Sequence, residues 1–243
     1  MKRIALFFIA ALISIGINAQ KTYALLTGIS NYGFDGLNLR NTTKDVKQLK
    51  KILDQQDMIV TTLTSKYATR ENMEKKLNAI IQLAKPEDRI IFFFSGHGNT
   101  GSFLAYGPQS FSYRELMSFF AKAKAKEVFC FIDACMSGSA GEIFEYDWSN
   151  DPNIHKGVTF FMSSRAEEYS TENNWIGHGF FTQALLKGLR GKADKNGDRN
   201  VTVIELFNYI YNDVTARTHD YEQIQHPQLI GPGSSHNTIL TNW

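Results

Sequence analysis

Two stretches decide the fold of this chain: R-I-I-F-F-F-S-G-H-G at residues 89–98 and V-F-C-F-I-D-A-C at residues 128–135. Residues 90–94 and 128–132 are apolar without interruption. Such a run is typical of a strand that is covered on both faces of a parallel sheet, because a strand with one face in water alternates apolar and polar residues. We therefore expect two central strands, each followed directly by polar residues.

Outward from these two strands, short β-rich runs alternate with longer amphipathic stretches. This alternation is typical of an α/β fold, in which helices connect the strands of a parallel sheet. Further strands are predicted at residues 22–28, 58–63, 158–163 and 238–240. Helices are predicted at residues 44–53, 71–83, 116–123, 179–189 and 203–214, with Thr42, Thr69 and Ser112 as N-caps of the first three. No repeat or Pro-rich linker divides the chain, so residues 20–243 are expected to form one domain.

The composition is that of a globular protein. Of the 243 residues, 43% are hydrophobic, 21% are charged and only 5 are Pro. These values exclude a disordered, collagen-like or coiled-coil chain. The formal net charge is only +2, so we expect no nucleic-acid partner.

The N-terminus has the pattern of a secretory signal peptide. A basic start, M-K-R, is followed by the apolar residues 4–13 and, before Gln20, by the small residue Ala19. The apolar run is too short to cross a bilayer core of about 30 Å. We therefore predict a signal peptide at residues 1–19, a secreted or periplasmic protein, and no stable membrane insertion after cleavage. The alternative is an uncleaved membrane anchor.

Cys130 and Cys135 are the only cysteines of the chain. Strand residues five apart are separated by about 16 Å, whereas a disulfide requires Cα atoms about 4.4–6.8 Å apart. Both are therefore expected to be thiols outside any disulfide. Such a thiol is either buried and inert or kept for chemistry, and its neighbours decide which.

A thiol and an imidazole follow the two central strands. Ser95-Gly96-His97-Gly98 comes after the first, and Asp133-Ala134-Cys135 comes after the second. The carboxyl ends of parallel strands open onto one crevice, where Cys135 and His97 could act as nucleophile and base. The backbone N–H groups of Gly98 and Cys135 could hold an oxyanion. The alternative is a buried, inert cysteine with a histidine nearby by chance.

The segments F-F-F-S-G-H-G at residues 92–98 and F-I-D-A-C-M-S-G at residues 131–138 resemble the caspase-like cysteine peptidases of the C14 type, and among them the bacterial metacaspases. The resemblance covers nearly the whole chain after the signal peptide. It implies a caspase-like three-layer sandwich, with a mostly parallel six-stranded sheet and helices on both faces. It also implies that a dyad of Cys135 and His97 hydrolyses peptide bonds without a third triad member.

Three positions match those that form the P1 pocket in metacaspase relatives: Asp45, Ser95 and Asp133. Two carboxylates that converge on one pocket favour a cationic side chain, so we predict cleavage after Arg or Lys. The alternative assigns Arg40 to the pocket and an Asp preference to the enzyme, as in animal caspases. A carboxylate at position 133 argues against this alternative because it would repel an acidic P1 side chain.

The overall prediction is an exported cysteine endopeptidase that acts on peptide or protein substrates, requires no cofactor and is a monomer. The segment after the nucleophile, residues 138–157, has no basic residue before Lys156, so we expect an enzyme that is active as a single chain. The rival from another class is a catalytically idle domain that holds a peptide in its cleft.

A second constellation, D-K-N-G-D-R-N-V-T-V-I-E at residues 194–205, has the spacing of an EF-hand calcium loop. The candidate calcium ligands are Asp194, Asn196, Asp198, Asn200 and Glu205. Position 6 of the loop holds Arg199, where the turn favours Gly. The alternative is a solvated turn that only caps the next helix.

Overall fold

The computed structural model describes residues 19–107, 109–135, 157–165, 172–173, 178–220 and 224–243. Except for Ala19, the predicted signal peptide lies outside these residues, as does almost all of the segment 138–157. Within the described residues, no helix is both long enough and apolar enough to cross a membrane.

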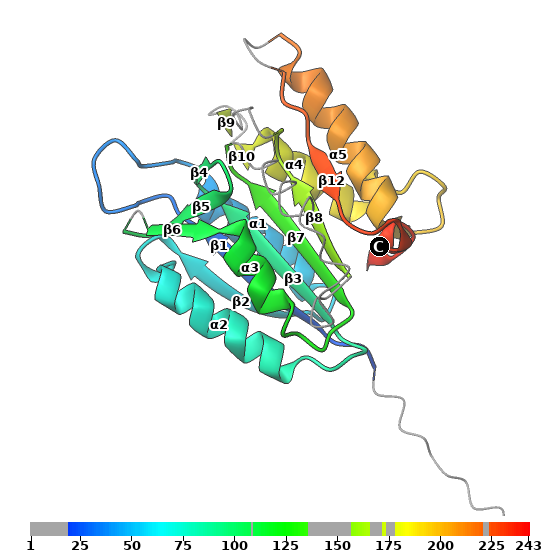
Figure 1. Ribbon diagram of the computed structural model, residues 1–243. Coiled ribbons are helices and arrows are strands. Elements are labelled where there is room, and N and C mark those ends of the chain that lie inside the picture. Colours follow the sequence, from blue (N-terminus) through cyan, green and yellow to red (C-terminus); the bar gives the residue numbers. More distant parts are fainter. Residues whose placement is uncertain (1–18, 108, 136–156, 166–171, 174–177, 221–223) are drawn as a thin grey trace, which may run out of the picture.

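A six-stranded sheet forms the centre of the molecule, in the order β12-β8-β7-β3-β1-β2 (Figure 1). Five strands are parallel: β1 (Thr22–Gly28), β2 (Ile59–Thr64), β3 (Arg89–Ser95), β7 (Glu127–Asp133) and β8 (Val158–Met162). The two uninterrupted apolar runs lie in β3 and β7, the central pair, as predicted. Every residue of β3 is buried, because helices cover both faces.

The strand predicted at residues 238–240 is present, but it does not belong to the main sheet. These residues overlap β13 (Ile239–Asn242), which pairs with β11 (Asn200–Thr202) in a separate two-stranded sheet. The sixth strand of the main sheet is β12 (Gln228–Ile230), which runs antiparallel to β8. It has only three residues, all of them half-buried, so it lacks the apolar run by which a central strand is recognised.

The helices form a layer on each face of the sheet (Figure 1). One layer contains α2 (Arg70–Leu83) and α3 (Tyr113–Phe120); the other contains α1 (Thr42–Asp54), α4 (Phe180–Lys187) and α5 (Val203–Thr218). Successive strand residues face opposite layers, so Phe92 packs with α2 and α3 while Phe93 packs with the other three helices. Burial of each such side chain contributes about 1.5–3 kcal/mol. The predicted three-layer α/β fold is confirmed.

The helix starts explain part of the sequence pattern. The Thr69 hydroxyl accepts the Asn72 N–H at the start of α2, and Ser112 forms a capping box with Glu115 at the start of α3. Both caps were predicted. Thr42, in contrast, is the first residue of α1 and not its cap; its hydroxyl lies 2.9 Å from that of Ser30.

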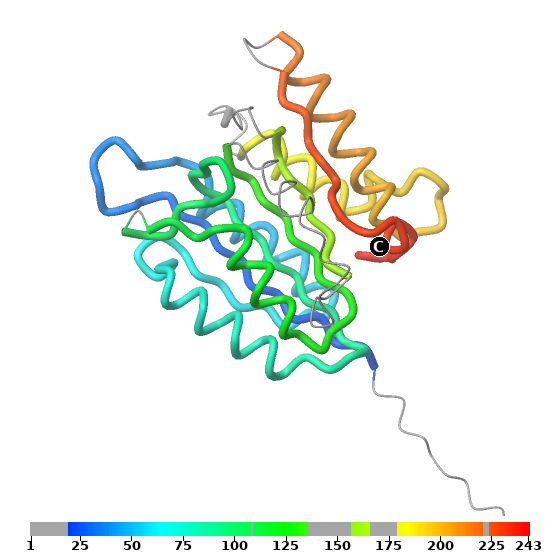
Figure 2. Tube along the Cα trace, viewed as in Figure 1, coloured from blue at the N-terminus to red at the C-terminus, as the bar shows by residue number. Residues whose placement is uncertain are grey.

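Short elements surround the carboxyl ends of the parallel strands. A hairpin of β4 (Gly98–Asn99), β5 (Ser102–Ala105) and β6 (Gln109–Ser112) follows β3, and β9 (Glu172–Asn173) pairs with β10 (His178–Gly179) just before α4. Figure 2 shows the loop at residues 29–41, in blue, beside this hairpin. The Tyr32 hydroxyl donates to the Leu104 carbonyl across the contact. Both segments therefore border the strand ends at which the candidate site lies.

The other helical segments of the described residues are short. They are η1 (Ser65–Tyr67), η4 (Gly188–Lys192) and η5 (Gly233–Ser235).

Candidate active site

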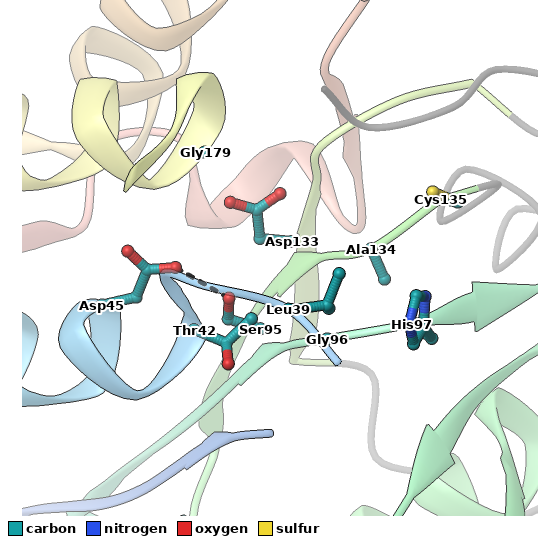
Figure 3. Close-up of a pocket in the computed structure, with 10 residues that line it drawn as sticks. All are labelled: Leu39, Thr42, Asp45, Ser95, Gly96, His97, Asp133, Ala134, Cys135 and Gly179. Carbon is teal, nitrogen blue, oxygen red and sulfur yellow. Dashed lines mark hydrogen bonds between the residues drawn. The ribbon is translucent and has the colours of Figure 1, made fainter. Parts of the chain in front are cut away.

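One cavity of about 90 Å³ opens at the carboxyl ends of β3 and β7. We call it the strand-end cavity (Figure 3). It contains all five side chains that the sequence predicts for catalysis and for the P1 pocket. The residues that line it are Leu39, Thr42, Asp45, Ser95, Gly96, His97, Asp133, Ala134, Cys135 and Gly179.

The two cysteines differ in accessibility. Neither is in a disulfide, as predicted. Cys130 lies in the middle of β7 and is completely buried, and this burial raises the pKa of its thiol far above the usual value. Cys135, two residues past the end of β7, is partly exposed and lines the strand-end cavity. Only Cys135 is therefore placed to meet a substrate.

A buried phenol lies within electrostatic reach of Cys135. Desolvation raises the pKa of Tyr113, and a negative charge on Cys135 raises it further. Tyr113 therefore stays neutral next to a thiolate.

His97 is held from two sides by the loop that follows β1. The Tyr32 hydroxyl accepts the His97 backbone N–H at 2.7 Å, and the imidazole Nε2 lies 2.9 Å from the Leu37 carbonyl oxygen. A carbonyl can only accept a hydrogen bond, so Nε2 carries the proton and Nδ1 is the basic nitrogen. The resemblance implied no third member beside the dyad; the structure adds the backbone of Leu37. Because every residue has a backbone carbonyl, the sequence does not mark Leu37 as a partner of His97.

The two segments that carry the predicted oxyanion donors touch each other. A Cβ atom on Gly98 would lie 2.3 Å from the Cys135 carbonyl oxygen, so only glycine permits this approach. The Leu104 N–H donates to the His97 carbonyl, so these two residues form a hydrogen-bonded pair of antiparallel strands. Such pairs alternate with pairs that share no hydrogen bond, and the next pair, Gly98 and Phe103, is of this second kind. The Gly98 N–H therefore points away from β5.

The strand-end cavity also contains two buried carboxylates. Asp45, which is 1% exposed, accepts a hydrogen bond of 2.8 Å from the Ser95 hydroxyl. Asp133, which is 7% exposed, accepts hydrogen bonds from the Thr182 hydroxyl at 2.6 Å and from the Thr182 N–H at 3.2 Å. Figure 3 shows both carboxylates on the side of the cavity away from Cys135 and His97.

Two further residues support the Asp133 carboxylate, and sequence reasoning did not assign them to the site. A Cβ atom on Gly179 would lie 2.7 Å from Asp133 Oδ2, so glycine at this position leaves room for the carboxylate. Thr182 donates to the same oxygen. Gly179 is the N-cap position of α4 and Thr182 lies in its first turn.

Among the described residues that line the strand-end cavity, none is Lys or Arg. Arg40, the residue of the alternative P1 pocket, is exposed and does not line the cavity. The electrostatic character of the cavity is therefore set by Asp45 and Asp133.

The candidate calcium ligands lie at residues 194–205, which we call the acidic loop; Asn196 and Asp198 are exposed, and Asp194, Asn200 and Glu205 are half-buried. Its oxygens accept hydrogen bonds from its own backbone: Asp194 from Gly197 and Arg199, and Asp198 from Asn200. Asn196 accepts the Asp198 N–H in the same way. Arg199 adopts the left-handed conformation, φ 64°, at the position that favours glycine.

Glu205 of the acidic loop forms a capping box with Thr202 at the start of α5. Its other oxygen accepts the Lys195 N–H. In the part of the chain that the structure describes, no three His, Cys, Asp or Glu side chains converge as metal ligands do. The role of this turn as a helix cap is thus confirmed, and calcium binding stays a prediction.

Comparison with known proteins agrees with the geometry. The model of the caspase-domain family matches residues 21–232. Metacaspase-1 from Mycosarcoma maydis is 26% identical over 182 residues, which are 62% of this chain and 45% of that protein. Metacaspase-1 from Debaryomyces hansenii is 33% identical over 88 residues, which are 32% of this chain and 20% of that protein. The chain thus matches less than half the length of these relatives.

Solved structures are similar in fold. Caspase-1 from Spodoptera frugiperda superposes with a TM-score of 0.68 at 18% identity, over 87% of this chain and 86% of that one. The protein GSU0716 from Geobacter sulfurreducens superposes with a TM-score of 0.67 at 16% identity, over 91% of this chain and 99% of that one. With a family match that extends over most of its length, this chain belongs to the caspase-domain family of cysteine peptidases, C14.

Proposed function

We propose that this protein is an endopeptidase that cleaves after Arg or Lys by means of Cys135 and His97. A single observation carries the proposal: one cavity is lined by a partly exposed thiol, an imidazole and two buried carboxylates. The thiol and imidazole supply the chemistry of amide hydrolysis, and the carboxylates supply a place for a cationic side chain.

The proposed reaction begins with the tautomer that Leu37 fixes. With Nε2 donating to the Leu37 carbonyl, Nδ1 of His97 takes the proton of Cys135, and the thiolate attacks the carbonyl carbon of the scissile bond. The N–H groups of Gly98 and Cys135 hold the resulting oxyanion. His97 then returns the proton to the leaving amine, and water hydrolyses the thioester with His97 again as base.

The P1 preference follows from the charges in the strand-end cavity. Asp45 and Asp133 are buried and accept hydrogen bonds from neutral hydroxyl groups. A guanidinium or ammonium group that enters between them forms charge-assisted hydrogen bonds and relieves the repulsion of the two carboxylates. An acidic P1 side chain would be repelled. The volume of about 90 Å³ suits the head of one long side chain.

Export remains part of the proposal, because M-K-R and the apolar residues 4–13 have the order of a signal peptide. We also propose that the chain is active without cleavage of the segment 138–157.

A monomeric state is supported by one of the two edges of the sheet, the edge formed by β12. β12 is three residues long and lies directly between Pro227 and Gly231-Pro232. Proline cannot donate a backbone hydrogen bond, and short edge strands with flanking prolines resist pairing with a second sheet.

Two cysteine variants and a peptide library test the proposal. Fluorogenic peptides with every residue at P1 are offered to the wild type, to Cys135→Ala and to Cys130→Ala, with and without calcium. We expect the wild type and Cys130→Ala to cleave after Arg and Lys, and Cys135→Ala to be inactive. Labelling of Cys135 by a peptidyl electrophile separates an enzyme from an idle binding domain. A wild type that cuts after Asp and ignores Arg would overturn the P1 assignment.

A further inference from the structure

Ser163 follows the last residue of β8 and is completely buried. Its backbone N–H donates to the Ile132 carbonyl at 2.9 Å, which continues the pairing of β8 with β7 by one more bond. This bond places the Ser163 side chain next to Ala134, the residue that precedes the proposed nucleophile.

The hydroxyl of Ser163 holds both polar groups of the Ala134 backbone. It accepts the Ala134 N–H at 3.1 Å and donates to the Ala134 carbonyl oxygen at 3.0 Å. One hydroxyl can do both, since it has a single proton and two lone pairs. A side chain here provides the bonds that a neighbouring strand backbone would otherwise supply.

These two bonds determine where the Cys135 N–H points. The Ala134 carbonyl and the Cys135 N–H belong to one trans peptide and therefore point in opposite directions. Ser163 lies on the β8 side of β7, and β3, which leads into Gly98, lies on the other side. With its carbonyl tied to Ser163, the peptide directs the Cys135 N–H toward the Gly98 side, where the proposed oxyanion forms.

The backbone of Ser163 is held in turn by Gln225. The side chain of Gln225, also completely buried, donates from Nε2 to the Ser163 carbonyl at 2.6 Å. The Gln225 backbone N–H donates at 3.0 Å to the hydroxyl of Thr218, the last residue of α5. The position of the hydroxyl is thus tied to a helix outside the cavity.

We propose that Ser163 is a positioning residue for the oxyanion hole: its hydroxyl orients the peptide between Ala134 and Cys135 so that the Cys135 N–H meets the developing negative charge. This inference rests on the proposed peptidase function. Removal of an oxyanion donor lowers kcat by about 100-fold to 1,000-fold. Ser163→Ala leaves the donor in place but loosens it, so we expect kcat to fall by about 10-fold to 100-fold with KM nearly unchanged.

Two readouts separate this role from a general structural one. A peptide aldehyde forms a tetrahedral adduct whose oxygen occupies the oxyanion hole, so Ser163→Ala should weaken its inhibition by the same factor as kcat. Iodoacetamide alkylates Cys135 without forming an oxyanion, so its rate should stay at the wild-type value. The rescue variant is Ser163→Thr, which keeps the hydroxyl and should keep kcat.

The matched control is Thr159→Val. Thr159 is a buried hydroxyl residue on β8 whose side chain lies 2.9 Å from that of Ser235. It loses a comparable hydrogen bond but does not contact Ala134, so kcat should not change. Equal kcat in Ser163→Ala and wild type, or a parallel loss in aldehyde binding and in alkylation rate, would overturn this inference alone. A wild type that cleaves no peptide would overturn the proposed function and this inference with it.

Discussion

The strand-end cavity and the acidic loop both contain carboxylates, but they hold them in opposite ways. In the cavity, Asp45 and Asp133 are buried and accept hydrogen bonds from side chains or backbone of other elements. In the acidic loop, Asp198 is exposed, and Asp194 and Asp198 accept hydrogen bonds from backbone N–H groups within the same turn. A buried carboxylate gains most from a cation, because water does not compensate its charge. The comparison therefore supports the proposal that the cavity recognises a cation, whereas Glu205 of the loop caps a helix.

The largest effect is expected from Asp133→Asn. The amide keeps an oxygen for the Thr182 hydroxyl but removes the charge that would face a P1 cation. Loss of one partner of a buried charge pair costs about 2–5 kcal/mol, or roughly 30-fold to 4,000-fold in kcat/KM. The measurement compares peptides with Arg and with citrulline, its neutral analogue, at P1. An unchanged ratio between the two would remove Asp133 from cation recognition.

A smaller effect is expected from Ser95→Ala. The variant removes the hydroxyl that donates to Asp45 Oδ2, and the buried carboxylate then holds its charge less readily. We expect KM for Arg peptides to rise about tenfold with kcat nearly constant. If kcat falls and KM does not change, Ser95 acts on the reacting groups instead of the P1 pocket.

In the acidic loop the expected effect is on stability. Glu205→Ala removes the capping box at the start of α5, which should lower the free energy of unfolding by about 1 kcal/mol. For a chain of this size that corresponds to a Tm lower by about 2–4 °C. Thermal unfolding followed by circular dichroism measures it. A Tm equal to that of the wild type would show that the cap contributes nothing.

The smallest effect is expected from calcium. The ion would compete with the N–H groups that Asp194 and Glu205 already accept. We therefore expect weak binding, with a Kd of about 0.1–1 mM, at the weak end of the range for EF-hand loops. Calorimetry on the wild type and on the double variant Asp194→Ala, Glu205→Ala tests this. A micromolar Kd that the double variant loses would break the comparison, because the loop would then be a cation site as well.

The sequence predicts most of this site because its residues follow two strands that can be recognised from their apolar runs. Ser95 and Asp133 end β3 and β7, and His97 and Cys135 come two residues later. These four side chains converge if β3 and β7 are parallel neighbours in the sheet. The pairing of Ser95 with Asp133 confirms that the two strands are parallel neighbours.

What the sequence could not predict depends on backbone groups and on short elements. Leu37 acts through a carbonyl, which every residue has, so no side chain marks it. Thr182 reaches Asp133 from an element 49 positions later in the chain. β12 is too short and too exposed to show a periodicity. Thr42 has the side chain of an N-cap, but it is the first residue of α1, and Asn41 occupies the cap position.

The difference between the two cysteines also determines how the protein can recover from oxidation of Cys135. Cys135 is accessible, whereas Cys130 is buried in β7 and has a strongly raised pKa. A thiolate that is oxidised to a sulfenic acid is usually recovered when a second cysteine attacks it to form a disulfide. Cys130 can neither ionise readily nor reach Cys135, and the chain has no third cysteine. Oxidative damage at the nucleophile can therefore be reversed only by a thiol from outside the protein.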